Sequence, residues 1–296
     1  MHERAGTVAK PEDLIDVDAL LAAYYEIEPD FTDPVQRVAF GTSGHRGTAM
    51  NGTFNEAHIV AITAAIVEYR ALQGTDGPLF VGADPHALSE PAWRTALEVL
   101  SAAGVQTYID SRRSWTPTPA VSLAILEANG APGKLRQLGP GLADGVVITP
   151  SHNPPTDGGF KYNPPTGGPA DSDATKAIAD RANAMLEDGS WREVPREPAQ
   201  EPTSMPNVHL YDFLGKYVDA LETVINFDAI RDAGVRIGAD PLGGAAVDYW
   251  GAIGERYGLD LTVVNETVDP TWSFMTLDWD GKIRMDCSSP HAMASL

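Results

Sequence analysis

A strand–helix–strand pattern between residues 79 and 109 constrains the fold class more than any other feature of the sequence. Leu79–Ala83 and Val105–Ile109 are short apolar runs with the length and composition of buried strands. A helix is predicted between them from Ser89, whose hydroxyl can cap free backbone N–H groups, to Gly104, a residue type that commonly ends helices. Strands that alternate with helices in this way indicate an α/β layered domain.

The same order of elements returns nearer the C-terminal end of the chain. The predicted elements there are a strand over Val235–Ala239, a helix over Ala245–Tyr257 and a strand over Leu261–Val264. A stretch rich in proline and charge, Gly189–Asn207, separates the two patterns and has the composition of an interdomain linker. With 296 residues, the chain is expected to fold as two domains.

Several other elements are predicted from local composition. Further helices are expected over Val17–Tyr25, 56–72, Ala174–Leu186 and Leu210–Val224. Residues 129–145 are rich in glycine and proline and are expected to form a surface loop. Ser288–Ala294 has the capping residue, the proline and the apolar start of a helix, which would have no room to continue before Leu296. A truncated chain is therefore expected.

The balance of charge limits the partners of the protein. The chain has 41 acidic and 21 basic side chains, so its formal charge at pH 7 is −20. Such a surface repels nucleic acid and anionic membranes, and neither is expected as a partner. An anionic substrate would need a local cationic pocket or a metal ion to reverse the field.

Cysteine content and hydropathy favour a cytoplasmic protein. Cys287 is the single cysteine, so the chain can form neither an internal disulfide nor a cysteine-based zinc site. The sequence has neither the apolar run of a signal peptide nor the roughly 20 apolar residues of a membrane span.

Two glycine-rich polar loops are the candidates for chemistry. In the first, Gly41–Gly47, the glycines let backbone N–H groups approach an anion, and Arg46 offers a planar fork suited to phosphate. Taken alone, a motif this short is more often a tight turn with a solvated arginine.

The second loop, Thr149–Ala170, follows a predicted buried strand, Gly145–Thr149, and is stiffened by several prolines. Ser151 could act in it as a nucleophile, His152 as a proton acceptor, and Lys161 as a proton donor or anion partner. The alternative is a surface loop with incidental polar residues, but the strand before it favours a functional site, since ligands bind at the carboxyl ends of strands.

The remaining candidates are weaker. Asp84 and Asp240 each follow a predicted strand, where an aspartate more often caps the next helix or turn. Four histidines are isolated in the sequence and are expected to be solvated or in the core: His58, His86, His209 and His291. The sequence contains no G-x-x-x-x-G-K-[ST], no strand-linked G-x-G-x-x-G, no H-E-x-x-H and no G-x-S-x-G motif.

Taken together, the two loops resemble one family. The motifs G-T-S-G-H-R-G and T-P-S-H-N-P-P-x-D-G-G-x-K-Y-N-P-P-x-G-G-P-A resemble those of the α-D-phosphohexomutase superfamily, most closely its bacterial, glucose-phosphate-specific branch. The elements G-A-D-P-L-G-G-A at 238–245 and D-P-T-W-S-F-M at 269–275 are also similar to that branch. The resemblance implies α/β/α layered domains, with a first domain at 1–206 and most of a second at 207–296.

The resemblance also implies a reaction. Ser151 would carry a phosphoryl group and interconvert glucose 1-phosphate and glucose 6-phosphate through glucose 1,6-bisphosphate. The same residue would provide one ligand of Mg²⁺, whereas His152 and Lys161 match positions implicated in proton transfer. The substrate-contacting positions implied by the first loop are Ser43, His45 and Arg46.

The chain departs from the family pattern at its C-terminal side. The family's metal loop, Asp-x-Asp-x-Asp-Arg, is absent and is expected beyond residue 296, as are the third and fourth domains. A single phosphoserine oxygen would be a poor site for Mg²⁺, which requires an octahedral shell. We therefore expect this chain to be inactive alone. The alternatives are a mutase for another hexose phosphate, a non-catalytic fragment and, more distantly, a serine hydrolase.

Overall fold

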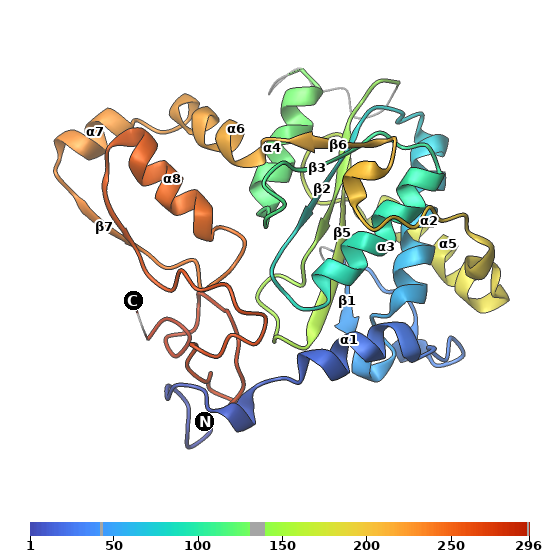
Figure 1. Cartoon of the computed structure of the whole chain (residues 1–296), viewed down its shortest axis with the longest axis horizontal. Helices are drawn as coiled ribbons and strands as arrows, with labels where there is room; N and C mark the ends of the chain where they lie inside the picture. Colours follow the sequence, from blue (N-terminus) through green and yellow to red (C-terminus); the bar gives the residue numbers. More distant parts are fainter. Residues whose placement is uncertain (42–43, 131–139, 295) are drawn as a thin grey trace.

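The computed structural model describes residues 1–41, 44–130, 140–294 and 296. Within these residues, six strands form one sheet in the order β1-β5-β4-β2-β3-β6 (Figure 1). Its strands are β1 (His45–Thr48), β2 (Leu79–Ala83), β3 (Thr107–Asp110), β4 (Asp144–Ile148), β5 (Asp157–Asn163) and β6 (Val208–Tyr211). β4, β2, β3 and β6 run parallel to one another, and β5 is antiparallel to its neighbours β4 and β1.

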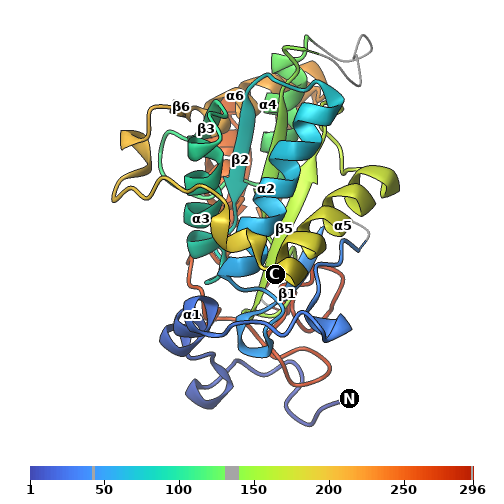
Figure 2. The ribbon, with the colours of Figure 1, turned by 90° about the vertical axis from the view of Figure 1, so that its right-hand side faces the viewer.

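Helices cover both faces of this sheet. The helices of the first unit are α1 (Val17–Glu26), α2 (Glu56–Gln73), α3 (Ser89–Ala102), α4 (Thr118–Ala128) and α5 (Ser172–Asp188). Side chains alternate across β4, so that Val146 and Ile148 join the core under α2, α3 and α5, whereas Val147 joins the core under α4. Figure 2 views the first of these faces, with α2 and α5 in front of the strands. The expected α/β/α layers are confirmed.

A smaller unit follows β6. It contains a two-stranded parallel sheet, β7 (Arg236–Ala239) and β8 (Asp260–Val263), with the helices α6 (Phe213–Ala220), α7 (Phe227–Asp232) and α8 (Val247–Tyr257). Residues 264–294 contain turns and isolated bridges around a separate apolar cluster that includes Trp272, Met275 and Leu277. No helix in the described part of the chain has both the length and the apolar character needed to cross a membrane.

The structure departs from several local expectations. The loop predicted over Thr149–Ala170 contains β5, and the helix expected over Leu210–Val224 begins as β6. Ser288–Ala294 forms turns in place of the expected helix. β1 and α4 were not predicted, and most of the loop expected over 129–145 lies outside the described residues.

Two contacts cross the division expected at 206/207. β6 pairs with β3 and so extends the first sheet, although it follows the expected linker. At the other end, the N-terminal segment bonds to the second unit: the N–H groups of His2, Gly6 and Ala9 donate to the carbonyls of Trp279, Leu277 and Met275. The domain ranges 1–206 and 207–296 therefore stay a prediction. The two contacts argue against a sharp boundary at 206/207.

A buried ion pair lies at the end of the sheet where strand β4 begins. Nε of Arg70 in α2 donates to Oδ2 of Asp144 at 2.8 Å, and the hydroxyl of Tyr162 in β5 donates to the same oxygen at 2.8 Å. Burial raises the pKa of Asp144 to about 6 even with Arg70 beside it. At neutral pH the carboxylate is thus ionised and depends on its cation.

Replacing Arg70 with methionine is expected to lower the free energy of unfolding by about 3 to 5 kcal/mol, since it leaves a buried charge without its partner. Arg181→Met is the matched control, because Arg181 in α5 pairs with Glu68 at an exposed site and should lose less than about 1 kcal/mol. Urea unfolding of both variants at neutral pH measures the difference. Equal losses would contradict the assignment.

Candidate active site

Strand β4 places Ser151 at the carboxyl end of the sheet. The backbone N–H of Thr149 donates to the carbonyl of Gly159 at 2.8 Å, so the strand pairing extends one residue past Ile148 before the chain turns. Ser151 then takes a φ of 71°, in the left-handed region, and its side chain is exposed. For a residue with a Cβ this conformation costs about 1 kcal/mol or more, and such strain accumulates at functional sites.

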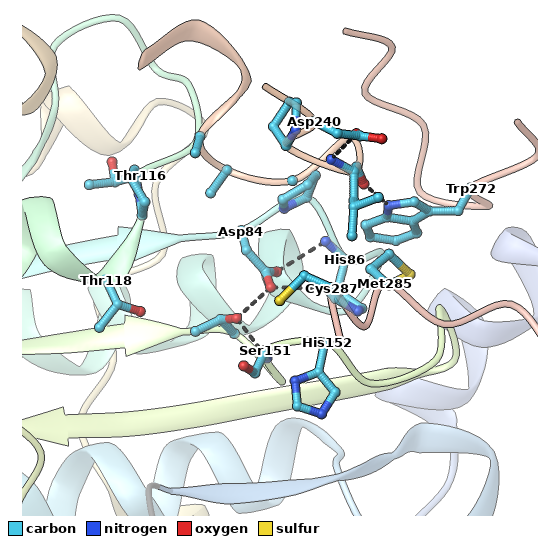
Figure 3. Close-up of a pocket in the computed structure, with 18 residues that line it drawn as sticks. Asp84, His86, Thr116, Thr118, Ser151, His152, Asp240, Trp272, Met285 and Cys287 are labelled. Carbon is cyan, nitrogen blue, oxygen red and sulfur yellow. Dashed lines mark hydrogen bonds and ion pairs between the residues drawn. The ribbon is translucent and has the colours of Figure 1, made fainter. Parts of the chain in front are cut away.

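Ser151 lines a cavity of about 350 Å³, which lies between the first sheet and the second unit (Figure 3). The wall on the side of the first sheet includes Asp84, His86, Thr149, Ser151 and His152. The opposite wall includes Asp240, Leu242, Trp272, Met285 and Cys287. Leu242 and Trp272 also have left-handed backbones, with φ of 52° and 50°. Both units therefore contribute to the cavity.

Asp84, directly after β2, is the most heavily hydrogen-bonded group of the cavity. Its Oδ2 accepts from Oγ1 of Thr149 at 2.5 Å and from Nδ1 of His86 at 2.9 Å, and its Oδ1 accepts from Oγ of Ser89 at 2.7 Å. Burial alone would raise the pKa of Asp84, but the charge of His86 and these hydrogen bonds outweigh burial and lower it. The carboxylate therefore stays ionised.

His86 completes the pair. Its Nε2 lies 3.1 Å from the carbonyl oxygen of Asn153, which can only accept. Burial lowers the pKa of His86, but the neighbouring Asp84 carboxylate raises it further than burial lowers it. Its ring centroid lies 4.6 Å from that of Trp272 in the second unit. His86 was expected to be solvated or in the core; it is buried, and the fold pairs it with Asp84.

The ion pair predicts a pH dependence of stability. Because folding raises the pKa of His86, its contribution is complete below the unfolded pKa of about 6.5 and is lost as the pH rises through the folded value. The lowered pKa of Asp84 adds stability above about pH 3.9, and this part is lost as the pH falls through its folded value. The pair should therefore stabilise the fold most between about pH 4 and pH 6.5.

Urea unfolding of the wild type and of His86→Gln at about pH 6 and about pH 9 tests this expectation. The stability difference between the two proteins should be larger at the lower pH. His45 and His58, which burial keeps neutral with their pKa lowered to about 3 and about 4, destabilise both proteins equally in acid and cancel from the difference. A difference that does not change with pH would refute the assignment.

The two glycine-rich loops meet through the pairing of β1 with β5. Arg46 lies opposite Gly159, and Lys161 follows two residues later on the same face of β5. Burial lowers the pKa of Lys161, and the charge of Arg46 lowers it further. Gly44 packs over Lys161, since a Cβ at Gly44 would lie 2.7 Å from Cγ of that lysine. Neither Arg46 nor Lys161 lines the cavity in front of Ser151.

The structure gives His45 a different setting from the expected substrate contact. The ring is 2% exposed and lies in the core, stacked on His58. Its Nδ1 accepts from the N–H of Ala39 at 3.2 Å, so its Nε2 donates to the carbonyl of Thr53 at 2.9 Å. Both nitrogens are used within the core, and neither is left for a ligand. Ser43, another expected substrate contact, lies outside the described residues.

Of the ligands of the expected Mg²⁺, the sequence places Ser151 in this chain and the remaining ones beyond residue 296. Among the residues that the structure describes there is no group of three or more His, Cys, Asp or Glu side chains placed to hold a metal ion. The carboxylate next to the loop, Asp84, is already occupied by its hydrogen bonds to Thr149, Ser89 and His86. Ser151 as a metal ligand therefore stays a prediction.

Comparisons with known proteins show the family of the chain. The model of the phosphoglucomutase/phosphomannomutase α/β/α domain I matches residues 37–188, and that of domain II matches residues 215–282. The phosphoglucomutase of Komagataeibacter xylinus is 53% identical over 99% of this chain and 51% of its own length. A phosphoglucosamine mutase of Synechococcus sp. (strain WH7803) is 29% identical over 88% of this chain and 48% of its own.

Solved structures show the same fold. Parafusin, a phosphoglucomutase from Paramecium, matches with a TM-score of 0.65 at 18% identity, over 91% of this chain and 48% of its own. A phosphoglucomutase/phosphomannomutase family protein from Burkholderia thailandensis matches with a TM-score of 0.56 at 20% identity, over 78% of this chain and 44% of its own. The chain spans about half the length of the curated relatives it matches. Since the two domain models cover most of the sequence, this chain belongs to the phosphoglucomutase/phosphomannomutase family.

Proposed function

We propose that the protein of which this chain is a part or the whole is a phosphoglucomutase that acts through a phosphorylated Ser151. The observation that carries the proposal is the position of Ser151: exposed, left-handed, and at the end of β4 on a cavity between two units. The 53% identity to the phosphoglucomutase of Komagataeibacter xylinus supports glucose phosphates as substrates. We further propose glucose 1,6-bisphosphate as the intermediate and Mg²⁺ as the metal.

The proposed step is a phosphoryl transfer between two oxygens. The bond from phosphorus to Oγ of phosphorylated Ser151 breaks and a bond forms to the free hydroxyl oxygen of the sugar phosphate. That hydroxyl loses its proton to a base, and the released Oγ of Ser151 takes up a proton to become a hydroxyl. His152 lines the cavity and can accept the proton. Lys161, with its pKa lowered, and Arg46 place two cationic side chains on one face of β5 and β1, where they offset local negative charge despite the net −20.

Phosphoryl capture tests the proposal directly. The full-length protein is incubated with glucose 1,6-bisphosphate and Mg²⁺, and the peptide that contains Ser151 is analysed by mass spectrometry. We expect one added phosphoryl group on Ser151 and none when Ser151 is replaced by alanine. Full-length wild-type protein that remains unmodified would overturn the proposal.

Two alternatives lie within the family. The similarity to a phosphoglucosamine mutase leaves another hexose phosphate open as the substrate, and a comparison of kcat/KM between sugar phosphates decides the matter. The chain spans about half of its relatives, so it could also be a fragment without activity of its own. Turnover by the 296-residue chain with Mg²⁺ and glucose 1,6-bisphosphate would exclude that alternative.

For the alternative of a serine hydrolase, the structure provides an Asp–His pair but no catalytic triad. His86 directs Nδ1 to Asp84 and Nε2 to the carbonyl of Asn153, so it has no nitrogen left to accept the proton of Ser151. Labelling of Ser151 by a fluorophosphonate is therefore not expected. A sugar phosphate as partner and a cytoplasmic location remain part of the proposal.

A further inference from the structure

We propose that the buried Asp84–His86 pair is the positioning device of the phosphoryl-carrying loop, and that it holds Ser151 through Thr149 on one side and through Asn153 on the other. The proposal rests on the function proposed for Ser151. It concerns two residues that touch neither Ser151 nor a substrate directly and that act through the backbone of the loop.

On the N-terminal side of Ser151, the hydroxyl of Thr149 connects the loop to Asp84. Its single proton goes to Oδ2 of Asp84 at 2.5 Å, so its lone pairs are free to accept from the N–H of Ser151 at 2.9 Å. A hydroxyl that donates to a carboxylate is a stronger acceptor than a free one, because the two bonds polarise each other. The direction of both bonds is thus set by the charge of Asp84.

On the C-terminal side of Ser151, the ring of His86 connects the loop to Asp84. The acceptors at its two nitrogens are a carboxylate oxygen of Asp84 and a backbone carbonyl oxygen of Asn153, and neither of these oxygens can donate. The ring therefore makes both bonds only as a doubly protonated cation. The Asp84–His86 ion pair therefore holds both Thr149 and Asn153 in place. Ser151, with its left-handed backbone, lies between these two residues.

The second unit closes over this pair. His86 is 2% exposed, and the indole of Trp272 covers its ring. Nε1 of Trp272 donates to the carbonyl of Leu242 at 2.9 Å, which fixes the indole within the wall of the cavity. Water is thereby kept from the pair, and its hydrogen bonds compete less with solvent. The geometry of the serine loop thus depends on a contact between the two units.

Without the connections through Thr149 and His86, Ser151 is expected to relax toward an ordinary backbone conformation. A displacement of about 1 Å at a reacting atom can cost about a hundredfold in rate. The effect should fall on the maximal rate of phosphoryl capture and leave the half-saturating concentration of the donor unchanged, since the polar atoms of Asp84 and His86 are already used in hydrogen bonds within the protein.

Variants of Thr149 distinguish a role in positioning Ser151 from a role in the stability of the fold. Thr149→Val keeps the shape of the side chain and removes both hydrogen bonds, whereas Thr149→Ser keeps the hydroxyl. Thr63→Val is the matched control, because Thr63 is also buried and its hydroxyl donates within α2, to the carbonyl of Ile59. Each variant is assayed for the rate of Ser151 phosphorylation by glucose 1,6-bisphosphate and for hydrogen exchange of the peptide around residues 149–154.

We expect Thr149→Val to lower the maximal rate about a hundredfold and to speed amide exchange in that peptide, with Thr149→Ser restoring most of both. His86→Asn and His86→Gln extend the test, since the first keeps a donor near Asp84 and the second a donor near Asn153. Each should recover only part of the rate. Wild-type rates and exchange in Thr149→Val, or an equal loss in Thr63→Val, would overturn the inference.

The outcomes also separate this inference from the proposed function. If the wild type captures no phosphoryl group, the proposed function fails, but hydrogen exchange still reports whether Thr149 and His86 hold the loop. If the wild type is phosphorylated and Thr149→Val matches it in both measurements, the function stands and the positioning role is refuted.

Discussion

Replacing Ser151 with alanine is expected to reduce the interconversion of glucose 1-phosphate and glucose 6-phosphate by the complete enzyme at least about a thousandfold. The reason is that, in the proposed mechanism, Oγ of Ser151 gives its phosphoryl group to the sugar phosphate and takes the other one back from glucose 1,6-bisphosphate, and alanine has no oxygen for either transfer. Cys287 also lines the cavity, but it lies on another loop and does not take the place of Ser151 at the end of β4. A coupled assay for glucose 6-phosphate measures the loss.

Two further variants make this test specific. Ser204→Ala removes an exposed hydroxyl from a short 3₁₀ helix far along the chain and should leave the rate unchanged. Ser151→Gly should be as inactive as Ser151→Ala but more stable, by about 1 kcal/mol, because glycine accepts a φ of 71° without strain. Near wild-type turnover in Ser151→Ala would refute the covalent mechanism.

The second large effect is expected from Gly159→Ala in β5. A Cβ at this position would lie 2.2 Å from the carbonyl oxygen of Thr149 and 2.6 Å from Cα of Pro150. These are backbone atoms of the segment that leads into Ser151, so the clash can be relieved only by moving that segment or separating β5 from β4. We expect a loss of about 2 to 3 kcal/mol in stability and about a hundredfold in the rate of Ser151 phosphorylation.

Gly168→Ala is the matched control for this substitution. Gly168 lies beyond the same strand, in open space, with no atom within 4 Å of a Cβ. It should therefore change neither the unfolding midpoint in urea nor the phosphorylation rate. If Gly159→Ala behaves like Gly168→Ala, the close approach of the two backbones does not constrain the serine loop.

The elements that sequence predicted best are those with a strong local signal. The apolar run Leu79–Ala83 is β2 residue for residue, and the helix expected at 56–72 is α2 to within one residue at its C-terminal end. In α2, Ile59, Ile62 and Ile66 recur at helical spacing and are all fully buried. A short-range pattern in the sequence is therefore enough to predict these elements.

β5 escaped prediction because its strand character comes from its neighbours. Gly158 and Gly159 weaken any local preference for a strand, yet a side chain at Gly158 would strike the ring of Phe54, and one at Gly159 would strike Thr149. The glycines are therefore required by close packing that only the folded sheet reveals. For the same reason the sequence suggested a loop over Thr149–Ala170.

The site was predicted unevenly for a related reason. Ser151 and His152 stand next to each other in the sequence, and both line the cavity as expected for a shared site. Asp84 carried a detectable signal, its position after a buried strand, but its partner Thr149 lies 65 residues further along the chain. His45 was misplaced because a motif specifies a residue type and not the face of the strand on which it lies.

During synthesis on a ribosome, the first nine residues of this chain emerge long before the residues they pair with. Val8 bridges to Thr276, and Ala9 bonds to Met275, so these contacts wait for nearly the whole chain. At about 5–20 residues per second, the wait is on the order of ten seconds to a minute. The six-stranded sheet can form meanwhile, since its last strand ends at Tyr211. This N-terminal segment thus stays unpaired until the second unit has been synthesised.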